Sequence, residues 1–419
     1  MTAGPLAGMK VVELAHIMAG PACGMMLADM GADVIKVEKP DGDDSRRFLP
    51  PAIEGESAAY MMMNRNKRGI ALNLKDPDAV EALRRLLAGA DVVIENYRKG
   101  TMEKLGLGYD TLREINPRLV YCEISGFGRT GPYAHRGGFD LIAQGMSGLM
   151  SITGEGPGRP PVKPGAPITD ITAGILAAMG CIAAYARARE TGQGQKVDTS
   201  LFEAGITLTY WQSAIAFATG EAPEPLGSAH PLNAPYQAFR TRDGWINVGA
   251  ANQANWLRLL DVIGAPELNE DPRFASNHDR MENLPALVEV LGGYLETRDT
   301  HDWLARMEAA GLPAGPVLTI PEMHADPQAI AREMIVETDH PVAGRVKAIG
   351  LPVKFSETPG RVDRPAPLLG QHGPEILAEL GYPPEAVDRL RASGALIVGA
   401  DAPDRAASPA PRVARRTAP

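Results

Sequence analysis

Residues 10–38 read KVVELAHIMAGPACGMMLADMGADVIKVE. Two short apolar runs, at 10–14 and 33–38, enclose a segment at 21–30 that begins with a proline. Proline suits the first turn of a helix, where the missing backbone N–H costs nothing. The stretch therefore predicts a strand, a helix and a second strand, which is the repeating unit of a parallel sheet.

The same alternation continues along the chain. Further strands are predicted at 91–95, 119–124 and 196–198, and helices at 77–87, 171–187 and 201–219. Short apolar strands separated by helices indicate a parallel sheet that is covered on both faces. We therefore predict an α/β fold with a Rossmann-like, doubly wound large domain.

Residues 225–320 differ in pattern and predict a smaller α+β domain. Two strand-like runs, 236–240 and 245–248, flank Asp243-Gly244, a pair that favours a hairpin because both residues tolerate positive φ. Helical spacing follows at 255–264, 284–295 and 301–310. Residues 400–419 hold four Pro, seven Ala and four Arg, a composition that predicts a disordered tail.

Composition limits the possible partners and compartments. The chain has 419 residues and a net charge of −9, which argues against nucleic-acid binding. Its three cysteines are odd in number and match no metal-ligand spacing, so we expect a reducing cytoplasmic location and no metal. The longest apolar run, 171–186, is shorter than a membrane span of about 20 residues, and predicts a buried helix rather than membrane insertion.

Polar groups follow the predicted strands, where open parallel sheets bind ligands. His16 follows the first strand, Lys39 the second, and Asn96 and Tyr97 the third. The cationic stretch 64–68 (NRNKR) is either a solvated loop or, with Lys39, Lys75 and Lys104, a phosphate site. The turn after the first strand lacks G-x-G-x-x-G, which disfavours NAD.

Asp170 stands directly before the predicted helix 171–187. One interpretation is an N-cap, which accepts a backbone hydrogen bond and suits the helix dipole. The other is a nucleophile that the helix start keeps ionised. Sequence spacing alone leaves both open.

Taken together, the motifs resemble those of the class III CoA-transferases, the CaiB/BaiF family, over nearly all of residues 5–398. The matching stretches are 11–21 (VVELAHIMAGP), 31–40 (GADVIKVEKP), 64–68, 92–97 (VVIENY), 125–128 (SGFG), 139–140, 147–150, 169–170, 192–195 (GQGQ), 230–231, 234–239 (APYQAF) and 370–372. Many ordered matches make the resemblance specific, although none would suffice alone.

The resemblance implies that both chain ends, 1–224 and 321–399, build the large domain around the small domain at 225–320, and that two ring-like subunits interlock as a homodimer. It implies that Asp170 attacks an acyl-CoA thioester and forms an aspartyl-acyl anhydride, with CoA as substrate and no permanently bound cofactor. By position, the implied CoA-site residues are His16, Ile17, Lys39, Leu72, Lys75, Asn96, Tyr97, Lys104 and, near the thioester, Asp140.

Departures from two branches narrow the expected reaction. Met18 replaces the Gln of the oxalate and formyl enzymes, and residues 249–255 replace their poly-Gly loop. Phe139 replaces the proton-transferring His of the acyl-CoA racemases, which disfavours racemase or isomerase activity, the main alternative. An inactive CoA-binding protein is a third possibility. The chain most resembles enzymes that move CoA from succinyl-CoA to a dicarboxylic acid, with Arg46 and His230 as candidate partners for its second carboxylate.

Overall fold

The computed structural model describes residues 4–399, so the predicted disordered tail at 400–419 lies outside it. The chain forms two compact units. Within the described residues, the first combines 4–147, 165–207 and 328–399, and the second combines Gly148–Pro164 with Leu208–Pro327. The predicted small domain at 225–320 falls within the second unit, which also takes in segments on either side of it.

A seven-stranded sheet organises the first unit, in the order β14-β5-β2-β1-β6-β7-β8. Its strands are β1 (Lys10–Glu13), β2 (Asp33–Glu38), β5 (Arg68–Leu72), β6 (Val92–Glu95), β7 (Val120–Ser125), β8 (Lys196–Ser200) and β14 (Leu396–Ile397). All pairs are parallel except β14 with β5, which is antiparallel. The predicted parallel α/β sheet is therefore correct, although the sequence interpretation missed β5 and β14.

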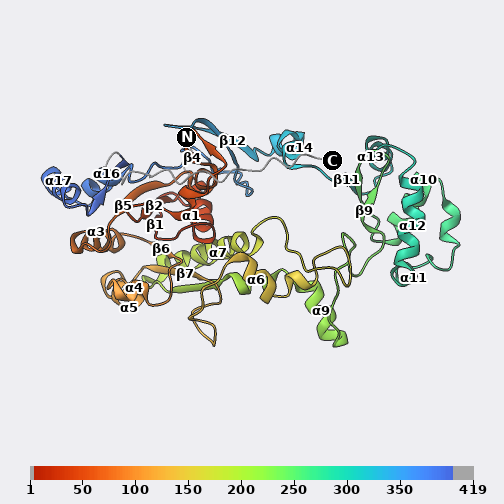
Figure 1. Cartoon of the computed structure of the whole chain (residues 1–419), viewed down its shortest axis with the longest axis horizontal. Coiled ribbons are helices and arrows are strands. Elements are labelled where there is room, and N and C mark those ends of the chain that lie inside the picture. The colour runs from red at the N-terminus through yellow and green to blue at the C-terminus, as the bar shows by residue number, and fades with distance from the viewer. Residues whose placement is uncertain (1–3, 400–419) are drawn as a thin grey trace. The chain divides into compact units, whose positions relative to one another are not determined.

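Helices cover both faces of this sheet (Figure 1). One face packs against α1 (Ala19–Asp29), α7 (Ile168–Thr191) and α8 (Leu201–Thr207). The other packs against α3 (Pro77–Ala88), α4 (Thr101–Lys104), α5 (Tyr109–Ile115), α16 (Gly373–Glu379) and α17 (Pro384–Ala392). Neighbouring strand residues enter opposite cores, as Val11 and Val12 do, because side chains alternate across a strand.

Helix α7 is the central helix of the first core and extends beyond the predicted 171–187 at both ends. By length and composition alone it is apolar enough to cross a membrane, and 39% of its most apolar window is buried inside the fold. Gly174 permits its close approach to α1, because a Cβ there would lie 2.7 Å from the Ala19 carbonyl oxygen. Small residues on α7 thus fit the predicted tight packing.

The remaining elements of the first unit lie outside the seven-stranded sheet. They are the 3₁₀ helix η1 (Asp44–Arg47), the short pair β3 (Ala52–Ile53) and β4 (Glu56–Ser57), α2 (Ala58–Asn64), α6 (Asp140–Met146), α15 (Pro327–Ala331, which begins at the unit boundary), and the hairpin β12 (Ile335–His340) and β13 (Gly344–Ile349). Of these, η1 and α6 lie close to the candidate site described below.

The second unit contains a three-stranded antiparallel sheet, β11-β10-β9, in which β9 is Tyr236–Arg240, β10 is Trp245–Gly249 and β11 is Ala314–Pro316. The predicted hairpin is present, but neither Asp243 nor Gly244 has a positive φ. Instead, the Gly244 N–H donates to the Thr241 hydroxyl. The predicted 201–219 helix is divided between α8 of the first unit and α9 (Tyr210–Thr219) of the second.

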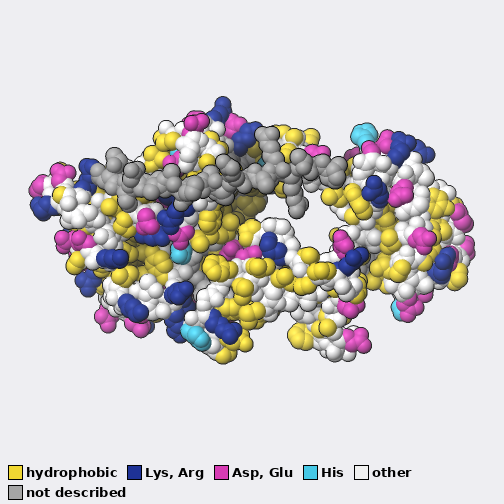
Figure 2. Space-filling model, in the orientation of Figure 1, with side chains coloured by type: hydrophobic (Ala, Val, Ile, Leu, Met, Phe, Trp, Pro, Cys, Tyr) yellow, Lys and Arg dark blue, Asp and Glu magenta, His cyan; other side chains and the backbone are white. Residues whose placement is uncertain are grey.

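Helices complete the core of the second unit. They are η3 (Pro266–Asn269), α10 (Gln253–Ile263), α11 (Asn277–Glu282), α12 (Leu284–Leu295), α13 (Thr300–Ala309) and α14 (Ile320–Ala325), with η2 (Leu149–Ser151) in the segment nearer the N-terminus. Trp256, Phe274 and Trp303 are buried in this core. Figure 2 shows that charged side chains of both signs are spread over the visible face of this α-helical part.

Candidate active site

A cavity of about 490 Å³ in the first unit opens at the carboxyl ends of β1, β6 and β7. Its lining includes His16 and Ile17 after β1, Asn96 and Tyr97 after β6, and Asp170 from the first turn of α7. Open parallel sheets bind ligands at this edge. The fold therefore brings the predicted nucleophile together with four of the residues predicted to contact CoA.

The other predicted CoA residues do not line this cavity. Lys39 forms an ion pair of 2.8 Å with Asp44, which does line it. Leu72 is 1% exposed and packs within the core behind β5. Lys75 and Lys104 are exposed to solvent and are not among the residues that line the cavity.

Asp170 is the third residue of α7, which follows the N-cap Pro167, so the N-cap interpretation is wrong. Burial, and next the charge of Asp140, raise the pKa of Asp170 to about 7. The expectation that the helix start keeps this carboxylate fully ionised is also wrong, because loss of solvent and a neighbouring negative charge outweigh the helix dipole.

Asp140, the first residue of α6, connects α6 to the start of α7. Its Oδ1 accepts hydrogen bonds from the Thr169 N–H at 3.0 Å and the Thr169 hydroxyl at 2.8 Å. Its Oδ2 accepts from the Gln144 amide at 2.7 Å. These contacts hold a second carboxylate beside Asp170. Phe139, directly before Asp140, is 73% exposed and brings no proton-transferring group.

Residues 16–18, which we call the 16–18 turn, join β1 to α1 and form one wall of the cavity. Ile17 has a φ of 69°, an outlier for a β-branched residue. The His16 ring lies edge-on to the Tyr97 ring, with centroids 6.0 Å apart. Burial lowers the pKa of His16, so its imidazole is neutral near pH 7.

A buried ion-pair group beneath the cavity was missed by the sequence interpretation. Arg129, which lines the cavity, pairs with Glu95 at 2.8 Å and Glu123 at 3.2 Å. Burial raises the pKa of Glu95 to about 7, although Arg129 opposes the shift. The available signal was a pair of carboxylates, Glu95 and Glu123, at or near the ends of apolar strands.

The cationic stretch 64–68 is neither a solvated loop nor a phosphate site. Arg65 pairs with Asp29 at 2.7 Å, and Lys67 pairs with Glu13 at 2.8 Å, all with side chains at most 4% exposed. Arg68, in β5, pairs with Asp33. These positive charges are therefore neutralised inside the protein, by carboxylates that come from distant parts of the chain.

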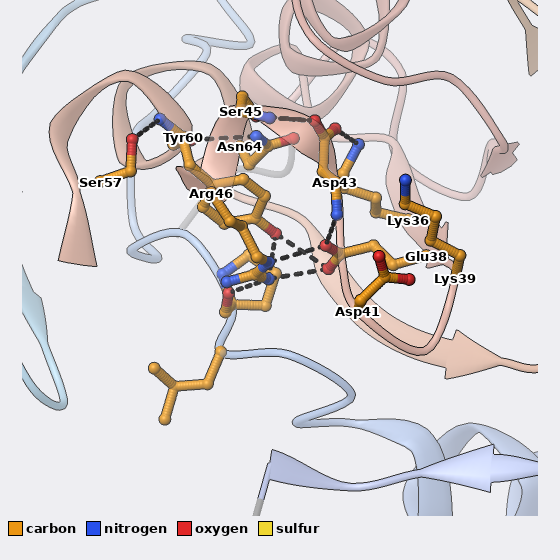
Figure 3. A network of polar contacts seen from close by, with 12 residues as sticks. Lys36, Glu38, Lys39, Asp41, Asp43, Ser45, Arg46, Ser57, Tyr60 and Asn64 are labelled. Carbon is orange, nitrogen blue, oxygen red and sulfur yellow. Dashed lines mark hydrogen bonds and ion pairs between the residues drawn. The ribbon is translucent and has the colours of Figure 1, made fainter. Parts of the chain in front are cut away.

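Arg46 is likewise engaged within the fold (Figure 3). Its guanidinium donates to both carboxylate oxygens of Glu38 at 2.7 Å, and also to the Tyr60 hydroxyl and the Pro367 carbonyl. The expectation that Arg46 binds the substrate's second carboxylate is therefore wrong. His230 belongs to the second unit, where it accepts from the Leu232 N–H and packs edge-on to Tyr236.

Comparison with known proteins places the chain in a family. Residues 6–373 match the family described as CoA-transferase family III, and the chain belongs to that family. It is therefore a member of a class of enzymes that transfer CoA, which fits an aspartate held at the carboxyl edge of a parallel sheet beside groups able to contact a large ligand.

The similar proteins include named enzymes. The chain is 41% identical over 383 residues to the succinate–glutarate CoA-transferase of Agrobacterium fabrum, covering 90% of this chain and 96% of that protein. It is 38% identical over 392 residues to the succinyl-CoA:glutarate CoA-transferase of Homo sapiens, covering 93% and 89%. A CaiB/BaiF family protein from Brucella suis has a TM-score of 0.81 and 41% identity, covering 91% of this chain and 100% of that one.

Proposed function

We propose that this protein moves CoA from succinyl-CoA to a dicarboxylic acid, with Asp170 as nucleophile. The observation that carries the proposal is the Asp170 carboxylate, which lies in a cavity. Among residues 4–399 the structure records no cationic partner for it. Relatives named as succinate–glutarate and succinyl-CoA:glutarate CoA-transferases support the donor and the acceptor class.

In the proposed first step, an Asp170 oxygen attacks the thioester carbonyl carbon. The carbon–sulfur bond breaks, its electron pair leaves with the CoA thiolate, and an aspartyl-acyl anhydride forms. The incoming carboxylate attacks the Asp170 carbonyl carbon of this anhydride, and the carbon–oxygen bond to the succinyl group breaks, which releases succinate. The thiolate then attacks the acceptor's carbonyl carbon in the new anhydride, which yields the acceptor's CoA thioester and restores the Asp170 carboxylate. No net proton is gained or lost, so the site needs a nucleophile and charge stabilisation rather than a general base.

The proposed CoA site extends beyond the cavity. His16, Ile17, Asn96 and Tyr97 contact the part of CoA near the thioester, beside Asp170 and Asp140. Further contacts to the remainder of CoA are proposed for three lysines, whose ammonium groups suit phosphate, and for the backbone of a buried leucine: Lys39, Lys75, Lys104 and Leu72.

The broader setting is proposed on the same basis. The protein acts in the cytoplasm without a permanently bound cofactor, and its larger domain is built from both ends of the chain around the smaller one. It works as an interlocked homodimer, with no nucleic-acid or membrane partner. Apolar side chains exposed on α9, namely Tyr210, Trp211 and Phe217, support a subunit interface. Light scattering on a sizing column gives the mass that tests the dimer.

The test of the chemistry is chemical trapping. Wild-type protein incubated with succinyl-CoA and hydroxylamine is expected to carry a hydroxamate on the peptide containing Asp170. Asp170→Asn should lose both the hydroxamate and at least about 10³-fold of the transfer rate, since the nucleophile is gone. Asp110→Asn, at an exposed carboxylate of α5, is the matched control and should behave as wild type. A fully active Asp170→Asn protein would refute the assignment.

A further inference from the structure

The 16–18 turn has an energetically unfavourable backbone. Ile17 lies at φ 69°, in the left-handed region that β-branched side chains rarely adopt. A residue persists in such a conformation only where its surroundings hold it there. Because this turn forms a wall of the cavity that contains Asp170, whatever holds Ile17 also sets the shape of the proposed CoA site.

Two side chains from other loops hold the turn. Asn96, after β6, accepts from the His16 N–H at 3.0 Å and donates to the His16 carbonyl at 2.9 Å. Asp43, after β2, accepts from the Ile17 N–H at 3.1 Å. Asn96 lies in the cavity itself, whereas Asp43 lies behind the turn and is 3% exposed. Asp43 therefore does not touch a ligand in the cavity, and its direct link to the 16–18 turn is this hydrogen bond to Ile17.

Asp43 is itself fixed by a fully buried network. The Lys36 ammonium donates to Asp43 Oδ2 at 2.8 Å, to Glu13 at 3.0 Å and to the Ala15 carbonyl at 2.8 Å, which uses all three of its donors. The Ser45 N–H and hydroxyl each donate to Asp43 Oδ1 at 2.8 Å. Figure 3 shows Asp43 beside Lys36 and Ser45, near the Glu38–Arg46 pair.

These contacts keep Asp43 charged and fix the direction of its carboxylate. Burial alone would raise the pKa of Asp43, but the Lys36 ammonium and the Ser45 donors hold it well below its usual range. An ionised acceptor makes a stronger hydrogen bond to a backbone N–H than a neutral one does. The carboxylate is thus suited to hold Ile17 in a conformation that the isoleucine side chain disfavours.

We propose that Asp43, fixed by Lys36 and Ser45, is a positioning residue that holds the 16–18 turn in the shape required to bind acyl-CoA. The inference rests on the proposed function, because it assigns this cavity to CoA. Asp43 does not touch the ligand; it acts through the Ile17 backbone. Neither the family match nor the resemblance of motifs assigns it this role.

The first experiment measures CoA binding by calorimetry. Asp43→Asn is expected to raise the dissociation constant at least tenfold, and to raise KM for succinyl-CoA more than it lowers kcat. Asp29→Asn is the matched control, since Asp29 is similarly buried and charge-paired but accepts its hydrogen bonds from Arg65 and Asn66 rather than from the 16–18 turn. It should bind CoA within twofold of wild type, even where urea unfolding shows a similar loss of stability.

A second comparison separates positioning from simple stabilisation. Ile17→Gly and Ile17→Ala both remove the side chain, but only glycine adopts positive φ without strain. The quantity compared is the CoA affinity of the glycine variant divided by that of the alanine variant. This ratio should be at least threefold larger in the Asp43→Asn background than with Asp43 intact. A purely structural Asp43 would leave this ratio unchanged, and that result would overturn the proposal.

A milder substitution covers the case in which Asp43→Asn fails to fold. Ser45→Ala removes one hydrogen bond to Asp43 and leaves the Lys36 ion pair in place. It is expected to weaken CoA binding about two- to fivefold, and unchanged affinity would overturn the proposal. Absence of CoA binding by wild-type protein would overturn the proposed function and this inference together. Wild-type binding that Asp43→Asn retains would overturn the inference alone.

Discussion

Two groups of buried charge in the first unit differ in one respect. Behind the 16–18 turn, each carboxylate has a cation: Glu13 pairs with Lys36 and Lys67, and Asp43 pairs with Lys36. In the cavity, Asp170 faces a second carboxylate, Asp140, and the structure of residues 4–399 records no ion pair to it. The first group is neutralised, whereas the second is left without compensation.

The pKa shifts follow from this difference. The Lys36 ammonium holds the pKa of Asp43 low against the effect of burial, whereas burial and Asp140 together raise the pKa of Asp170 to about 7. A paired carboxylate is stable but unreactive, because its lone pairs are engaged. A partly desolvated and unpaired carboxylate is a better nucleophile, at a cost in stability. The contrast agrees with the proposed role of Asp170 as nucleophile.

The largest expected effect comes from breaking the paired group. Lys36→Met removes the cation shared by Glu13 and Asp43, whose side chains have at most 1% exposure. Breaking a buried pair by removing one partner costs about 3–5 kcal/mol, since an uncompensated charge remains. Urea unfolding of the ligand-free protein measures the loss. A change below about 1 kcal/mol would show that the buried pairing contributes little.

The contrast also explains what the sequence could and could not reveal. Alternating apolar runs were enough to predict β1, β2, β6, β7 and β8 and the edge of the sheet where the site lies. Strand β5 was missed because it begins with Arg68, whose carboxylate partners Asp33 and Glu379 are 35 and 311 residues away. Ion pairs between residues so far apart leave no local pattern in the sequence. The paired cations at 64–68 therefore resembled a phosphate site.

The candidate site shows the same limit. The residues after β1 and β6 could be found from their places at strand ends, and Asp170 from its place at the start of an apolar helix and from family motifs. The partner that raises the pKa of Asp170 is 30 residues earlier in the chain, and only the fold brings it close. Positive φ at Ile17 carries no sequence signal, because that conformation normally selects glycine or asparagine.

The next effect is on the pH dependence of the unpaired group. Because the pKa of Asp170 is raised to about 7, its reactive carboxylate form increases with pH through that value. We expect kcat/KM for succinyl-CoA to rise between about pH 5.5 and 7 and to level off above about pH 8. Asp140→Asn removes the neighbouring charge and should move the midpoint to lower pH.

The contacts of Asp140 favour this variant. The introduced asparagine would keep an acceptor oxygen for the N–H and hydroxyl of Thr169. Its NH2 group could donate to Gln144 Oε1, which has no hydrogen-bond partner now, once the Gln144 amide rotates. Glu95 also has a pKa near 7, but Asp140 is not among the causes of its shift. A midpoint that stays in place in Asp140→Asn would therefore assign the titration to Glu95 rather than Asp170.

The smallest expected effect on stability comes from removing an ion pair that is not buried. Arg242 and Asp299 form an ion pair of 2.5 Å in the second unit, with side chains 61% and 42% exposed. Exposed pairs gain little, because water and salt screen both charges and the side chains lose freedom when they pair. Arg242→Ala should therefore leave the thermal unfolding midpoint within about 1 °C of wild type. A loss of stability as large as that of Lys36→Met would mean that ion pairs stabilise this protein whether or not they are buried. Burial would then no longer account for the difference between the paired carboxylates and Asp170.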